Sequence, residues 1–117
     1  MKLSHGNAND NDALHHLYEI WDKGEDRLFK YGVSDDPIDE TDGLSDRIRD
    51  QLYFLNLAMG WVRFVGKILI RNINGRVKAK MLEREYIDNF EKAYGQRPQG
   101  NPLRRKTKFD DPFRTDF

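Results

Sequence analysis

The strongest structural signal in the sequence is a β-hairpin between His16 and Ser34. A run of β-forming residues at His16–Trp21 precedes five residues that favour a turn, among them Gly24, which can take a positive φ. A second run follows at Leu28–Ser34, in which one set of alternating residues is Phe29, Tyr31 and Val33. The pattern predicts two antiparallel strands joined by a short turn.

A helix, a strand and a second helix are predicted after the hairpin. The first helix begins near Leu44 or at Ser45, with Ser45 as its cap, and ends at Gly60. Trp61–Arg71 is rich in β-forming residues and predicts a third, central strand. The expected inward face of the first helix carries four apolar residues: Ile48, Leu52, Leu55 and Met59.

The second helix is predicted over residues 76–94, after a turn at Asn72–Gly75 in which Asn74 is a candidate cap. Gly95 stands where a left-handed residue commonly ends a helix. Six residues of this helix have the spacing of a buried face: Val77, Met81, Leu82, Tyr86, Ile87 and Phe90.

These elements predict an α+β fold, with a small, three-stranded, mainly antiparallel sheet flanked by helices. At 117 residues the chain has the length of one domain. We expect residues 1–14 to be a linker or tail, residues 15–103 to be the folded domain, and residues 104–117 to be a C-terminal tail. Asp35–Asp42 is an acidic segment with Pro37 and no periodic pattern, and is expected to be a loop.

The composition excludes several classes of protein. The chain has no cysteine, so it has no disulfides or thiolate metal sites, and any metal must use oxygen or imidazole ligands. No apolar run approaches the roughly 20 residues that a membrane span requires, so we expect no membrane contact. The segment Met1–Asp12 lacks the basic and apolar regions of a signal peptide.

The two halves of the chain carry opposite charge, although the net charge is zero. Residues 1–60 contain 6 basic and 13 acidic side chains, whereas residues 61–117 contain 14 basic and 7 acidic side chains. One surface of the folded domain can therefore be basic enough to meet phosphate. The alternative is that these charges only solvate a small domain.

Two short motifs in the predicted hairpin resemble the two halves of the signature of GIY-YIG nucleases. Leu17-Tyr18-Glu19-Ile20 is similar to the first half, with Tyr18 at the tyrosine. Lys30-Tyr31-Gly32-Val33 is similar to the second half, with Gly32 at the glycine. His16 stands at the first glycine of the family pattern, and Lys30 where the family usually has tyrosine. Because side chains alternate along a strand, we expect Lys30 rather than Tyr31 to face the site.

Three later segments complete the resemblance, which covers roughly residues 16–101. The segment from Asp46 to Gln51 is similar to the helix that carries the family's arginine, here Arg47. The segment from Ala79 to Ile87 is similar to the family's glutamate helix, with Glu83 at the glutamate. Asn101 is similar to the closing asparagine of the family.

The resemblance implies a metal-dependent nuclease with defined roles for these residues. Glu83 would hold one Mg²⁺ (or Mn²⁺), and Arg47 would clamp the scissile phosphate. Tyr18 would be the general base or its helper, with His15 or His16 as alternative proton acceptors that titrate closer to neutral pH. A nearby cation must then lower the pKa of Tyr18 from about 10. Further expected site residues are Lys30 and Tyr31 in catalysis and Gly32, Arg49 and Asn101 in substrate binding.

Each of these residues also has a purely structural interpretation. Tyr18 fits a half-buried aromatic residue of any hairpin. Arg47 and Arg49 can pair with neighbouring aspartates in an exposed first turn, and Glu83 can pair with Lys80 at helical spacing. The joint order and spacing of the motifs favour the nuclease interpretation.

A second resemblance concerns the segment Ser4-His5-Gly6-Asn7, which is similar to the junction before the C-terminal toxin domains of Rhs-type polymorphic toxins. It implies a secreted, larger toxin that acts in the cytoplasm of a target cell and has a cognate immunity protein. We expect a monomer that cuts nucleic acid, DNA in preference to RNA. The alternatives are a non-catalytic module that binds nucleic acid or protein, and a repair or mobile-element enzyme.

Overall fold

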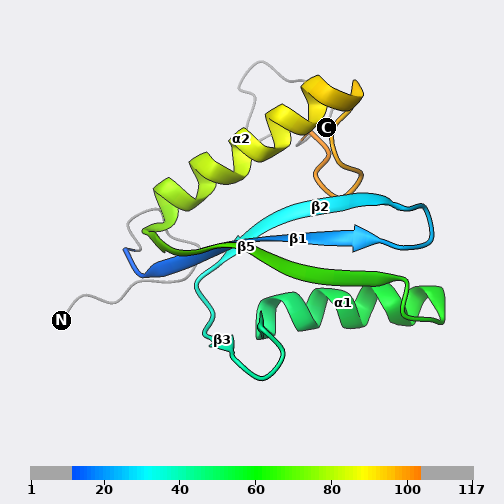
Figure 1. Cartoon of the computed structure of the whole chain (residues 1–117), viewed down its shortest axis with the longest axis horizontal. Helices are drawn as coiled ribbons and strands as arrows, with labels where there is room; N and C mark the ends of the chain where they lie inside the picture. The colour runs from blue at the N-terminus through cyan, green and yellow to red at the C-terminus, as the bar shows by residue number, and fades with distance from the viewer. Residues whose placement is uncertain (1–11, 104–117) are drawn as a thin grey trace, which may run out of the picture.

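The structure, a computed structural model, describes residues 12–103 as an α+β domain (Figure 1). It contains a three-stranded antiparallel sheet and two helices, which confirms the predicted fold class. The main elements are β1 (Leu14–Asp22), β2 (Arg27–Ser34), α1 (Asp46–Met59), β5 (Phe64–Asn74) and α2 (Arg76–Tyr94). The predicted linker up to residue 11 and the predicted tail from residue 104 lie outside the described residues.

The first strand lies at the centre of the sheet, whose strand order is β2-β1-β5. We predicted a central position for the third strand, and this prediction is wrong. The reason lies in burial: β1 buries Leu17 and Ile20 completely, whereas β5 exposes Lys67 and Arg71. A strand covered on both faces needs apolar residues on both, and an edge strand can carry charges.

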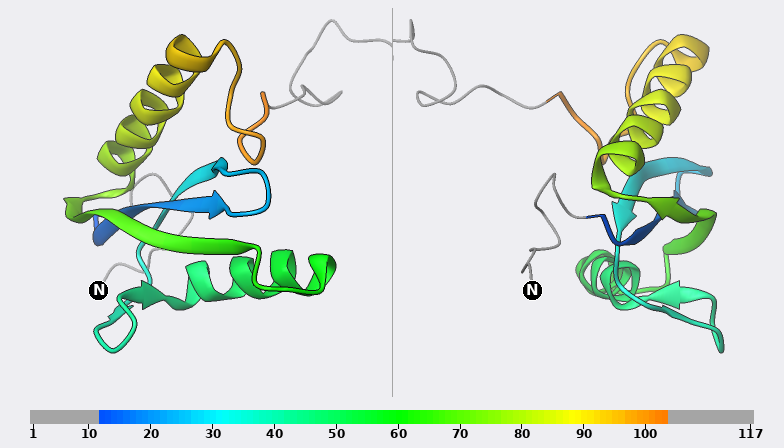
Figure 2. Two further views of the ribbon diagram at one scale, coloured as in Figure 1. Left: turned by 45° about the vertical axis from the view of Figure 1, so that its right-hand side comes forward. Right: turned by 90° about the vertical axis from the view of Figure 1, so that its left-hand side faces the viewer.

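Two small cores lie on opposite faces of the sheet (Figure 2), with α1 over one face and α2 over the other. Alternation along β1 divides its residues between them. Tyr18 and Ile20 pack with Ile48 of α1, whereas Leu17 packs with Ala79 of α2. The central strand therefore carries side chains toward both helices.

Helix α1 has the predicted ends but not all of the predicted buried face. Ser45 precedes it and Gly60, with φ of 77°, closes it in the left-handed conformation. The Ser45 side chain makes no cap hydrogen bond and instead pairs with His16. Ile48 is buried, but Met59 is 46% exposed because its sulfur lies against the Arg63 guanidinium at the surface.

Helix α2 also spans the predicted residues, and Gly95 closes it with φ of 80°. Val77 and Met81, which we predicted to be buried, are 54% and 60% exposed. Both lie on the side of the helix opposite to Ala79, the residue that packs against the sheet. The apolar stripe that faces the sheet is narrower than the sequence pattern indicated.

Strand pairing changes two of the predicted boundaries. Asn72–Asn74, expected in a turn, belongs to β5, because Leu14 pairs with Asn74 across the sheet. As a result Gly75, with φ of 87°, precedes α2, and Asn74 does not cap it. The acidic loop also contains a short two-stranded sheet, formed by β3 (Ile38–Asp39) and β4 (Leu44–Ser45).

The segment after α2 covers the outer edge of β2 (Figure 1). The Gly100 amide donates to the Phe29 carbonyl at 2.7 Å. The side chain of Asn101 bonds both backbone groups of Tyr31, accepting from N at 2.7 Å and donating to O at 2.9 Å. One edge of the sheet is therefore closed by residues that also border the site described below.

Neither described helix is apolar over a stretch long enough to span a bilayer.

Candidate functional site

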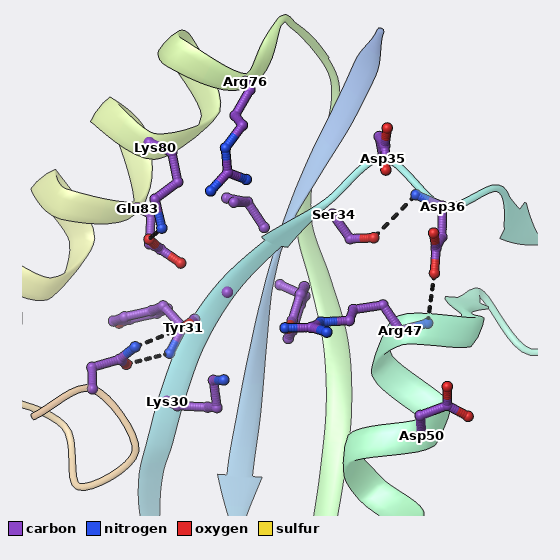
Figure 3. A pocket seen from close by; sticks show the side chains of 14 residues that line it. Lys30, Tyr31, Ser34, Asp35, Asp36, Arg47, Asp50, Arg76, Lys80 and Glu83 are labelled. Carbon is purple, nitrogen blue, oxygen red and sulfur yellow. Dashed lines mark hydrogen bonds and ion pairs between the residues drawn. The ribbon is translucent and has the colours of Figure 1, made fainter. Parts of the chain in front are cut away.

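A cavity of about 500 Å³ lies at β2, between the beginnings of α1 and α2 (Figure 3). Strands β1 and β2, both helices and the segment after α2 contribute to its lining. The sequence predicted seven of its lining residues: Tyr18, Lys30, Tyr31, Gly32, Arg47, Glu83 and Asn101. The fold thus brings residues more than 80 positions apart into one polar pocket.

Tyr18 forms part of the pocket because Gly32 leaves room for its ring. The two residues are paired across β1 and β2. A Cβ atom at position 32 would overlap the phenol of Tyr18, so only glycine fits there. Tyr18 is 1% exposed overall. The glycine of the second half-motif therefore determines where the tyrosine of the first half-motif lies.

Gln51 connects Lys30 to Tyr18. Lys30 Nζ donates to Gln51 Oε1 at 2.9 Å, and Gln51 Nε2 donates to the Tyr18 hydroxyl at 2.5 Å. Lys30 thus lies on the same face as Tyr18, as strand alternation predicted. Sequence reasoning did not select Gln51 as a site residue, although it lies one helical turn after Arg47, where i and i+4 residues share a face.

Burial raises the pKa of the Tyr18 hydroxyl. Hydrogen bonds from Gln51 and Arg47 act in the opposite direction without cancelling it. Arg47 therefore lowers this pKa as expected, but burial outweighs its effect and the pKa is raised overall. Burial also lowers the pKa of Lys30, and the Arg47 charge lowers it further.

Tyr31 faces away from Tyr18 and packs on α2. Its ring centroid lies 5.3 Å from that of Tyr86, and it belongs to the core around Leu17. Tyr31 and Asn101 border the pocket, but the Asn101 amide is already occupied by the Tyr31 backbone. Through these two hydrogen bonds, Asn101 holds the last described segment against β2.

Two arginines of α1 have different surroundings. The Arg47 side chain points into the pocket, while its backbone amide donates to Asp36 at 3.0 Å (Figure 3). No carboxylate of residues 12–103 forms an ion pair with Arg47.

Arg49 is held away from the pocket by acidic residues. It lies 2.8 Å from Asp42, 2.7 Å from Asp46 and 3.3 Å from Asp39. Its hydrogen bond lowers the pKa of Asp42 to about 2. Arg49, which we predicted to contact substrate, does not line the cavity.

Glu83 faces the pocket from α2, and its side chain is 13% exposed. Lys80, one turn earlier, donates to it at 2.5 Å. Glu85 is exposed and does not border the pocket. Residues 12–103 contain no group of three or more acidic, histidine or cysteine side chains able to enclose a metal. A metal bound here would thus depend on Glu83 with water and substrate oxygens as further ligands.

The two histidines lie outside this pocket. His16 is 2% exposed, its Nε2 lies 2.9 Å from Ser45 Oγ, and burial lowers its pKa. It borders a separate cavity with Asp36 and Arg71. His15 Nδ1 contacts the Ala13 carbonyl at 2.7 Å. His16, which we predicted to be catalytic, therefore does not line the pocket that contains Glu83.

The pocket also contains charged residues that sequence reasoning did not select as catalytic. Asp36 and Asp50 border it from the side of α1, and Arg76 and Lys80 from α2 (Figure 3). Arg76, Lys80 and Glu83 have the spacing i, i+4, i+7, which places them on one face of a helix. That spacing was visible in the sequence and is the signal by which Arg76 and Lys80 can be found.

The family model of Tox-URI2, described as URI fold toxin 2, matches residues 8–95. No curated protein and no solved structure matches the chain.

Proposed function

The chain belongs to the URI fold toxin 2 family, and we propose that it is a metal-dependent endonuclease that hydrolyses phosphodiester bonds. In this proposal it is a nuclease of the GIY-YIG type and prefers DNA to RNA. It is the toxic tip of a larger, secreted polymorphic toxin of the Rhs type, acts in the cytoplasm of a target cell, and works as a monomer.

One observation carries the proposal: the pocket unites the tyrosine, lysine, arginine and glutamate selected from the sequence motifs. These residues come from four different elements, so their meeting is not a consequence of proximity in the chain. Cleavage of a phosphodiester requires positive groups at the developing charge and a group that binds a metal ion. Lys30 and Arg47 can supply the first, and Glu83 the second.

The direction of the hydrogen bonds favours a donor role for Tyr18. An ammonium group can only donate, so Lys30 makes Gln51 Oε1 the acceptor and turns Gln51 Nε2 toward Tyr18. With its oxygen accepting from Gln51, the Tyr18 O–H is free to donate into the pocket. We therefore propose that Tyr18 donates to a phosphate oxygen, in place of the general-base role expected from the family resemblance.

Glu83 is the residue that would hold Mg²⁺ (or Mn²⁺). A single carboxylate suits Mg²⁺, which usually keeps several waters and binds one or two carboxylates together with substrate phosphates. The partly buried position of Glu83 in a pocket with unpaired cations fits that donor set. A metal bound there would polarise the phosphate. Lys80 competes for the same carboxylate, so metal binding would have to displace or rearrange this ion pair.

A toxin of this kind requires a partner that protects the producing cell, and we propose a cognate immunity protein that covers the pocket. The acidic segment between Asp35 and Asp42 is one candidate contact surface, because its first residues already border the pocket. The basic tail, the second candidate, lies outside the described residues.

A non-catalytic module that binds nucleic acid or protein is the alternative function. The ion pair between Lys80 and Glu83 favours it, because a carboxylate neutralised in this way needs no metal.

Cleavage assays on the purified chain separate the two functions. We expect plasmid DNA, and to a smaller extent total RNA, to be cut in Mg²⁺ but not in EDTA. Glu83→Gln should lower the rate by roughly a thousandfold because it removes the metal ligand. Glu85→Gln, two residues away and exposed, should leave it unchanged. Full cutting by the Glu83 variant, or binding without cutting by the wild type, would refute the proposal.

A further inference from the structure

Arg76 enters the pocket from the side opposite to Arg47. It is the first residue of α2, and its side chain points from the helix toward β2 (Figure 3). Its Nε atom is buried and has no hydrogen-bond partner. Within the described part of the chain, no carboxylate forms an ion pair with it.

A buried guanidinium N–H without an acceptor costs free energy, commonly about 1–3 kcal/mol for an unsatisfied buried donor. Most such groups are paired in folded proteins, so an exception needs an explanation. The first turn of α2 contains no acidic residue that a small rotation could bring to Arg76. An acceptor from outside the described chain would satisfy this group.

The pocket itself indicates the chemistry of that acceptor. Guanidinium groups bind phosphate through two parallel N–H donors, a geometry that a lysine does not offer. Four basic and four acidic side chains line this pocket, so its net charge alone does not select an anion. The buried Nε of Arg76, which has no hydrogen-bond partner, is the feature that indicates one.

We propose that Arg76 forms a second phosphate subsite, which binds a phosphate of the substrate strand other than the one that is cut. This inference rests on the proposed nuclease function. Arg76 and Glu83 lie seven residues apart on α2, which corresponds to about 10 Å along the helix axis. A nucleic-acid strand rises about 3.4 Å per nucleotide along the duplex axis. Arg76 therefore contacts a phosphate within about three nucleotides of the cut bond.

The two subsites also define the path of the strand. Gly32, Val33 and Ser34 border the pocket between the two helices. A strand held by Arg47 at one end and by Arg76 at the other crosses the end of β2 at these residues. The ligand is thus a strand of several nucleotides, and a mononucleotide would occupy only one of the two subsites.

Binding measured in EDTA, where we expect no cleavage, tests Arg76 separately from catalysis. The probe is a fluorescein-labelled DNA duplex, titrated by anisotropy at several salt concentrations. Arg76→Met, which keeps the aliphatic stem, should weaken binding by roughly tenfold at low salt and reduce the salt slope by about one. Arg84→Met removes the same charge from an exposed position of α2 outside the pocket and should change affinity less than twofold.

Neutral methylphosphonates placed one at a time in the strand then locate the contact. One position near the cut bond should weaken binding of the wild type but not of Arg76→Met. Two results would overturn the subsite even if the wild type cuts DNA. One is equal affinity of the Arg76→Met and Arg84→Met variants, and the other is a methylphosphonate effect that persists in Arg76→Met at every position. If the wild type binds the duplex with an Arg76-dependent slope but never cuts it, the nuclease proposal fails and the subsite stands. Absence of any binding by the wild type would refute both.

Discussion

Two polar side chains lie four residues apart on β1, both about 1% exposed, yet their surroundings differ. At the turn end, Asp22 accepts four hydrogen bonds. Two come from the backbone amides of Gly24 and Glu25, at 2.9 and 3.2 Å, and two come from Arg63, at 2.7 and 2.9 Å. Every charge and donor in this cluster is matched by a partner in the fold.

In the middle of the same strand, Tyr18 lies near arginines that are not matched in this way. Arg47 and Arg76 form no ion pair with any carboxylate of residues 12–103, and Arg76 Nε lacks an acceptor. Buried polar groups are normally satisfied, so an exception such as Arg76 Nε needs an explanation. The Asp22 cluster is thus satisfied within the fold, whereas the arginines near Tyr18 keep groups that the proposed substrate would satisfy.

The largest expected effect contrasts the two arginines of α1. Arg47→Ala should lower the cleavage rate by roughly a thousandfold, because it removes a cation at the developing phosphate charge. Arg49→Ala should change it less than twofold, because Arg49 is occupied by Asp42 and Asp46. Initial rates of plasmid cleavage measure both. A comparable loss in the two variants would mean that the unpaired arginine has no special role.

The next effect should appear in stability rather than activity. Asp22→Ala leaves Arg63 and two backbone amides without their acceptor, and we expect a loss of about 3 kcal/mol in the free energy of unfolding. Urea denaturation measures it, with Glu25→Ala as the control at an exposed neighbour 3.7 Å from Arg63. Cleavage per folded molecule should stay the same; a selective loss of activity would make Asp22 part of the site.

The stabilisation by Asp22 should also depend on pH. Hydrogen bonds from Arg63 hold the pKa of Asp22 below its ordinary value of 3.8. Its contribution is thus fully present above that ordinary pKa and is lost as the pH falls through the lower pKa of the folded state. The difference in unfolding free energy between wild type and Asp22→Ala should therefore shrink below about pH 4.

The smallest effect tests the role of Tyr18. Tyr18→Phe should reduce the cleavage rate by roughly a hundredfold, the usual loss for one donor at a developing charge, whereas Tyr31→Phe on the other face should not. Burial raises the pKa of Tyr18, so the hydroxyl stays protonated from pH 6 to 9. The pH–rate profiles of wild type and variant should then have the same shape in this range. A tenfold rise per pH unit that only the wild type shows would instead make Tyr18 the general base.

The site could be predicted in part because some signals are local. The half-motifs placed Tyr18 and Gly32 on paired strands, and the resemblance to the family's glutamate helix selected Glu83, which lines the pocket. Gln51 and Arg76 were not selected, because their importance depends on what lies across the pocket. Arg49 was selected, but the acidic residues that occupy it belong to a segment without a recognisable pattern.

The sequence by itself determined the elements of the fold and most of their ends. Gly60 and Gly95 end the helices at the predicted positions because the left-handed backbone conformation that ends a helix favours glycine. The hairpin follows equally from local propensities and turn chemistry.

Only the tertiary structure decided the strand order and the partners of each charged group. The central place of β1 and the extension of β5 to Asn74 depend on pairing between segments more than 40 residues apart. Whether an arginine is neutralised, like Arg49, or left facing a pocket, like Arg47 and Arg76, depends on distances between elements. Local sequence cannot encode those distances, because electrostatic and hydrogen-bond energies are set by separation and burial in the folded chain.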